Sequence, residues 1–148
     1  MLLNKLSAPP KFGSIQIVGW KVYLCRMNIS VLHNVFPSVV VDNFDIIDLK
    51  ENLSEERLDI YLDEKKIIPD SLKNREVISH GFTSEKVIQD FPLRGKAVYL
   101  HLRRRKWLDK ESNTIHTRTY DISFDGTQLT KEFVSFLKDA HREYITKL

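Results

Sequence analysis

The clearest pattern in the sequence is an alternation of apolar and polar residues from Lys96 to Leu108. Successive side chains of a β-strand point to opposite faces, so this spacing predicts a long strand that buries Val98, Leu100 and Leu102. The segment Arg57 to Glu64 alternates in the same way. Both segments therefore read as half-buried strands of a sheet.

Turn-forming residues separate these strands from their neighbours. In the turn Pro92-Leu93-Arg94-Gly95, proline fixes φ and glycine accepts a positive φ, which predicts a hairpin with the strand Lys86 to Phe91. The polar segment Asp109 to Asn113 predicts a second turn, leading into a strand over Thr114 to Phe124. Phe44 to Leu49 is expected to form a further strand.

A helix is predicted after Gly126, with Thr127 or Thr130 as N-cap and Glu132 in the first turn. Its apolar residues recur at helical spacing and are expected to pack against the sheet: Phe133, Phe136, Leu137, Ala140 and Tyr144. The predicted fold class is α+β, with a mostly antiparallel β-sheet, a long basic β-hairpin and a covering C-terminal helix.

A length of 148 residues predicts one domain. Residues 1–26 contain Pro9-Pro10 and little periodicity, so we expect a poorly specified extension before a single domain over 27–148, which opens with a short helix ahead of Pro37. Neither a membrane-spanning run nor a secretion signal is evident, so the cytoplasm is the expected compartment. The single cysteine, Cys25, excludes an internal disulfide and a cysteine-based zinc site.

Charge is segregated along the chain. Residues 42–64 contain nine acidic and two basic residues, whereas residues 91–110 contain seven basic residues and only Asp109 as an acid. Such asymmetry can steer a polyanion onto one face, let two copies attract each other head to tail, or serve solubility alone.

The face of the long strand opposite its apolar residues carries a row of cationic and aromatic side chains, namely Tyr99, His101, Arg103, Arg105 and Trp107. Their spacing of about 6–7 Å is similar to that of successive phosphates along a nucleic-acid strand. A bulge near Arg104 would alter this register. Alternatively, the arginines pair with the acidic segment 42–64, and the aromatic residues simply pack.

A two-stranded β-ribbon fits the major groove of DNA, and the predicted hairpin of Lys96 to Leu108 with Thr114 to Tyr120 would supply one. The candidate nucleic-acid-binding residues are Arg94, Lys96, Arg103, Arg104, Arg105, Lys106, Trp107, Lys110 and Arg118. The predicted partner is therefore double-stranded DNA.

The stretch Ile88 to Trp107, IQDFPLRGKAVYLHLRRRKW, resembles the N-terminal region of the ISAon type of bacterial insertion-sequence transposases. The resemblance extends back to Phe44 and forward through Gly126 to Phe133, and covers roughly residues 27–138. It implies a module that helps a transposase recognise its own DNA ends, with strand-transfer chemistry on a separate catalytic domain or subunit. Related regions adjoin a zinc-binding knuckle whose ligands are missing here, and a family arginine-tryptophan pair is replaced around Thr119 to Ile122.

We predict no catalytic activity, no cofactor and no metal site for this chain. Transposase chemistry needs acidic side chains that converge on two metal ions within a larger scaffold, and the histidines lack metal-ligand spacing. The alternative function is a protein-interaction module, in which the basic strand docks a transposase catalytic subunit or the acidic segment of a second copy, giving a homo-oligomer.

Overall fold

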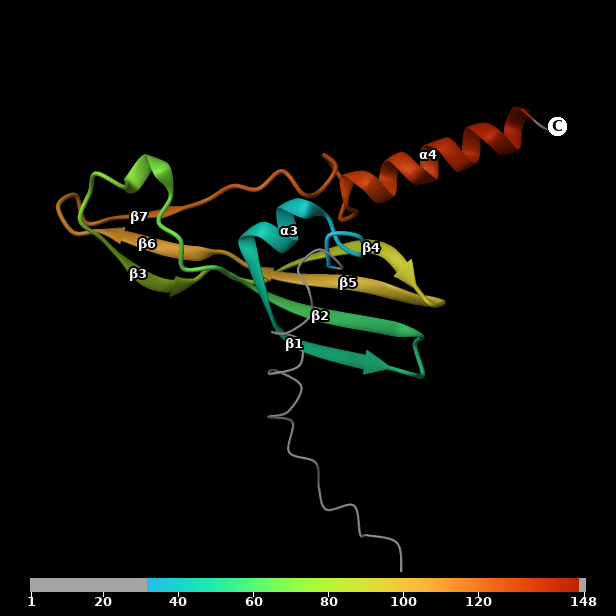
Figure 1. Ribbon diagram of the computed structural model, residues 1–148, viewed down its shortest axis with the longest axis horizontal. Coiled ribbons are helices and arrows are strands. Elements are labelled where there is room, and N and C mark those ends of the chain that lie inside the picture. Colours follow the sequence, from blue (N-terminus) through green and yellow to red (C-terminus); the bar gives the residue numbers. More distant parts are fainter. Residues whose placement is uncertain (1–31, 147–148) are drawn as a thin grey trace, which may run out of the picture.

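The structure is a computed structural model, and it describes residues 32–146 (Figure 1). The expected extension over 1–26 and the caps of the short N-terminal helix lie outside the described residues. The first described elements are a turn at Leu32 to Phe36 and the short helix α3, Ser38–Asn43. Together with the strands and the C-terminal helix, they confirm the predicted α+β class with mostly antiparallel strands.

Seven strands form two sheets that lie end to end (Figure 1). The four-stranded sheet has the order β1-β2-β5-β4, with β1 at Phe44–Asn52, β2 at Arg57–Glu64, β4 at Lys86–Leu93 and β5 at Lys96–Arg103. The three-stranded sheet has the order β3-β6-β7, with β3 at Val77–Phe82, β6 at Arg105–Asp109 and β7 at Thr114–Thr117. All neighbouring strands are antiparallel except β2 and β5, which are parallel.

The predicted long strand over Lys96 to Leu108 is interrupted, so its expected continuity is wrong. It leaves the four-stranded sheet after Arg103 and enters the three-stranded sheet at Arg105. At the crossing point Thr83 replaces a strand neighbour: its backbone N–H donates to the Arg104 carbonyl at 2.8 Å, and its Oγ1 accepts from the Arg104 N–H at 3.1 Å. The two parts of the strand therefore bury their side chains independently, each within its own sheet.

The hairpin predictions are confirmed at one turn and shortened at the other. β4 and β5 are joined through Arg94 and Gly95, which both have positive φ, 51° and 80°. The second hairpin joins only β6 and β7, because the last strand ends at Thr117 and does not continue to Phe124. The basic ribbon is consequently shorter than expected.

The main core fills one face of the four-stranded sheet. The alternating residues predicted to be buried are buried, including Leu58, Ile60 and Leu62 on β2 and Val98, Leu100 and Leu102 on β5. Helix α3 and the segment after β7 cover this face with Val40 and Ile122. Burial of such side chains is the main stabilising contribution that the pattern predicted.

Helix α4, Lys131–Thr146, begins at one of the two predicted caps. Thr130 is fully buried, its Oγ1 accepts from the Phe133 N–H at 3.3 Å, and its hydroxyl donates to the Asp90 carboxylate at 2.8 Å. The first turn contacts β4 through the Phe133 ring, which packs against Phe91, and Val134 is buried, whereas the remainder of the helix projects away from both sheets (Figure 1). The expectation that its whole apolar face is buried is therefore wrong.

Glu64, the last residue of β2, joins the two sheets. Its side chain is 1% exposed; one carboxylate oxygen accepts from the Arg105 backbone N–H at 2.8 Å and the other from the Tyr120 hydroxyl at 2.8 Å. Burial, and then the hydrogen bond to Glu64, raises the pKa of Tyr120 to about 12. A single carboxylate thus ties β2, β6 and the segment after β7.

We expect Glu64→Ala to lower the free energy of unfolding by roughly 2–4 kcal/mol, because it removes two hydrogen bonds and leaves buried donors without acceptors. Urea unfolding measures this loss. Glu55→Ala, in the exposed turn between β1 and β2, is the matched control and should change the free energy by less than about 0.5 kcal/mol. Equal effects of the two substitutions would contradict the role of Glu64.

Candidate nucleic-acid interface

The parallel pairing of β2 with β5 brings the acidic and basic halves of the chain side by side. Asp59 lies opposite Tyr99, Tyr61 opposite His101, and Asp63 opposite Arg103. Side chains at such positions lie on the same face of the sheet, here the face opposite the core. The charge segregation seen in the sequence is therefore compensated within one molecule, at least along these two strands.

Arg103 is held by Asp63 in a two-pronged ion pair. Its Nε donates to Asp63 Oδ1 at 2.7 Å and one terminal nitrogen donates to Oδ2 at 2.8 Å. This hydrogen bonding raises the pKa of Arg103 above its ordinary value. Bidentate arginine–carboxylate pairs are strong and directional, so the guanidinium already has the kind of partner that a phosphate would offer.

Arg105 is directed back onto the protein rather than outward. Its Nε and one terminal nitrogen donate to the Glu64 carbonyl at 3.3 and 3.1 Å, and the other terminal nitrogen donates to Ser79 Oγ at 2.9 Å. The guanidinium also lies 4.5 Å from the centre of the Phe82 ring. These contacts make Arg105 a connector between β2, β3 and β6.

His101 forms the most buried polar cluster of this face, which sequence reasoning missed. Its two ring nitrogens lie 2.6 Å from carboxylate oxygens of Asp59 and Glu85, and its ring stacks on Tyr61 with 4.4 Å between centroids. Burial alone would raise the pKa of Asp59, but hydrogen bonds from Arg57 and His101 outweigh it and lower that pKa. The only signal in the sequence was that His101 and Asp59 both occupy the polar face of alternating strands.

Three further candidate residues pair with acidic side chains. Lys96 contacts Glu51, and Lys110 contacts Glu76. Arg118 lies 4.0 Å from the buried Glu64 carboxylate and donates to the Ile67 carbonyl at 3.3 Å. Exposed pairs of this kind contribute little to stability, and a polyanion can compete for their lysines.

Arg94, Arg104 and Lys106 are the candidate cations that contact no carboxylate among the described residues. Arg94 lies exposed in the β4–β5 turn. Within residues 32–146, the Arg104 guanidinium donates only to the Arg118 carbonyl, at 3.2 Å. Lys106 lies opposite Thr117, on the face of the three-stranded sheet that also carries the exposed Ile78 and Ile115. Arg104 and Lys106 therefore leave positive charge near the junction between the sheets.

Trp107 lies in the interior of the three-stranded sheet, where it is 2% exposed. Of the two interpretations of this residue, base stacking and packing, burial supports packing. Its Nε1 is a buried nitrogen without a hydrogen-bond partner in the described part of the chain. Its orientation follows from the interruption at Arg104, which gives β6 its own buried face.

The positive net charge of the protein resides outside the described residues. Residues 32–146 contain 18 basic and 20 acidic residues, a net charge of −2, whereas residues 1–31 contain four basic residues and no acidic ones. Attraction of a polyanion to the folded part would consequently depend on local clusters of cations rather than on its overall charge.

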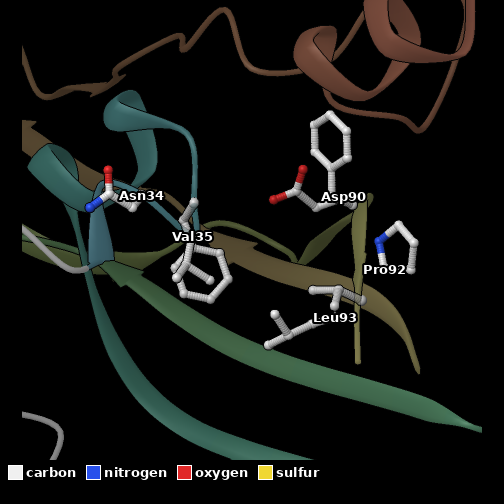
Figure 2. A pocket seen from close by; sticks show the side chains of 8 residues that line it. Asn34, Val35, Asp90, Pro92 and Leu93 are labelled. Carbon is white, nitrogen blue, oxygen red and sulfur yellow. The ribbon is translucent and has the colours of Figure 1, made fainter. Parts of the chain in front are cut away.

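A small cavity of about 240 Å³ lies between the turn before α3 and the end of β4 (Figure 2). Val35, Phe91 and Leu93 line it, and the Asp90 carboxylate points into it. Burial raises the pKa of Asp90, which also holds the cap of α4 through Thr130. The volume is below the roughly 300–1,000 Å³ typical of ligand pockets, so we assign Asp90 a structural role.

The described residues contain neither a metal-binding cluster nor a membrane-spanning helix. No group of three histidine, cysteine, aspartate or glutamate side chains within residues 32–146 could hold a metal ion. Over the same residues, no helix combines the length and the apolar character needed to cross a membrane.

Comparison with known protein families, curated proteins and solved structures finds no match.

We expect acid to weaken the three-stranded sheet through Asp109. The hydrogen bond from Arg75, at 3.0 Å, is the main reason that the pKa of this buried carboxyl falls from 3.8 to about 2. A depressed folded-state pKa stabilises the protein above the unfolded value, and this contribution is lost as pH falls from about 3.8 to about 2. Urea unfolding of the protein and of Asp109→Asn at several pH values should show a gap at pH 5 that closes towards pH 2.

Proposed function

We propose that the protein is a non-catalytic, DNA-binding module of a bacterial insertion-sequence transposase, and that it helps recognise the ends of the element in the cytoplasm. The support is the resemblance of residues 88–107 to ISAon-type transposases, together with the cations Arg104 and Lys106 that the internal ion pairs leave over. In this proposal, strand transfer belongs to a separate catalytic domain or subunit.

The proposed contact surface is smaller than the whole basic stripe. It centres on Arg104 and Lys106, which have no carboxylate partner in the described part of the chain, and includes Arg94 at the other end of β5. Lys106 lies on an open face of the three-stranded sheet, next to the edge strand β7. Arg103 and Arg105 then act as positioning residues that orient this part of the chain through Asp63 and Glu64.

A protein-interaction module is the second candidate function. The version in which the basic strand docks an acidic segment of another copy loses its support, because Arg103 already pairs with Asp63 of the same chain. What favours an interaction module is the exposed apolar face of α4, which is a different surface.

Salt dependence of DNA binding tests the proposed contact surface. We expect the full chain to bind a 25-base-pair duplex in fluorescence anisotropy, with log affinity falling linearly with log salt. The double variant R104A/K106A should reduce the slope by about 1.8, since each lost phosphate contact accounts for about 0.9. The single variant R103A should leave the slope unchanged, because that guanidinium is occupied by Asp63.

Lys50→Ala is the control for the loss of one positive charge far from the junction, on the edge strand β1. The slope of log affinity against log salt for this variant should equal that of the unchanged protein. A slope that responds to R103A as strongly as to R104A/K106A would show that the ion pairs open on DNA. If the protein does not bind the duplex even at low salt, the DNA-binding proposal is wrong and the protein-interaction module is the function that still has support.

A further inference from the structure

Helix α4 exposes an apolar stripe that the described part of the chain covers only at its beginning. Phe136 is 53% exposed, Leu137 44% and Tyr144 67%, and Ala140 between them is exposed as well. Monomeric soluble proteins rarely leave so many large apolar side chains together at the surface, and such patches usually mark an interface.

The stripe has the spacing of a helix–helix seam. Phe133, Leu137, Ala140 and Tyr144 follow one another at intervals of four, three and four residues. Two helices pack along such a pattern with side chains of one filling the spaces of the other. Apart from Val134, Phe136 and Ile145, the residues of α4 outside this seam are polar.

The protein itself occupies only the beginning of this seam. Phe91 of β4 packs against Phe133 and Phe136 with centroids 5.1 and 5.4 Å apart, and Lys138 lies over the Phe124 ring. Beyond these contacts, α4 projects freely from the sheets (Figure 1). The exposed Phe91 and Leu93 extend the apolar surface from the helix onto the end of β4.

We propose that a second copy of this chain covers the stripe, with the two α4 helices packed antiparallel. In that alignment Leu137 of each helix faces the small Ala140 of the other, and Tyr144 of each faces Phe133 beside Phe91. The pairs are complementary in size, large with small at the centre and aromatic with aromatic at the ends. A parallel alignment would instead place the sheets of both copies at the same end of the helix pair, where each helix already packs against its own β4.

The residues beside the seam are compatible with this alignment. In an antiparallel pair, each side of the seam on one helix meets the same side of the seam on its partner. One side carries Phe136 and Glu143, and the other carries Val134 and His141. Each charged or titratable residue therefore lies across from an apolar one, so like charges are not opposed next to the seam.

The size of the apolar surface indicates a weak dimer. With 150–250 Å² for a whole aromatic side chain, the exposed parts of the stripe, Phe91 and Leu93 offer roughly 500 Å² per chain, or about 1,000 Å² per pair. This is the lower limit for a specific interface, so the dimer should dissociate on dilution. The inference concerns α4 alone and does not rest on DNA binding.

Sedimentation velocity of the full chain tests the association. We expect a monomer of 17.4 kDa at low micromolar concentration and a dimer at several hundred micromolar. Leu137→Glu should weaken dimerisation at least tenfold, whereas Ser135→Glu, which adds the same charge on the opposite side of α4, should not. A monomer at every concentration, or equal effects of the two substitutions, would overturn the proposal.

Disulfide trapping tests the orientation. Two variants in a Cys25→Ser background, L137C and A140C, are oxidised separately and as a mixture. Antiparallel packing predicts disulfides mainly between the two different variants, because residue 137 faces residue 140 of the partner. Disulfides formed mainly within each single variant would indicate a parallel pair and overturn the proposed arrangement. Circular dichroism melts of both variants verify that they are folded.

Discussion

The buried carboxylate of Glu64 is the interaction on which the arrangement of the two sheets depends. It stands where β2 ends, and its two oxygens bind the backbone of Arg105 and the hydroxyl of Tyr120. A charged group is costly to bury unless its oxygens are satisfied, so this position fixes both partners closely. The start of β6, and with it the face that Trp107 buries, follows from that constraint.

The same region shows what a segregated charge pattern can mean. Acidic and basic stretches far apart in sequence invite interpretation as surfaces for other molecules. Here the parallel pairing of β2 with β5 converts much of that asymmetry into internal contacts, such as Asp63 with Arg103 and Asp59 with His101. Charge segregation in the sequence therefore specifies a strand pairing as well as any external partner.

Local features of the fold were predictable and distant ones were not. The buried residues Val98, Leu100 and Leu102 and the turn at Gly95 follow from alternation and turn chemistry within a few residues, and the cap at Thr130 is one of the two that the sequence offered. The interruption at Arg104 depends on Thr83. Pairing of the arginines with the acidic segment 42–64 was one of the two alternatives, but the particular pair Arg103–Asp63 depends on a parallel strand reached through a crossover. Neither neighbour can be inferred from the residues around the motif.

The strands beside each candidate cation determine whether that cation pairs with a carboxylate of the protein. β5 lies next to β2, whose sequence RLDIYLDE supplies Asp59, Asp63 and Glu64. β6 lies between β3 and β7, whose sequences VISHGF and TIHT contain no acidic residue. One continuous basic motif is thus neutralised before the crossing at Arg104 and left positively charged after it. Recognition of a polyanion by the strand itself would consequently centre on its second half, with Arg94 as a separate contact in the preceding turn, because of strand order rather than because of the arginines themselves.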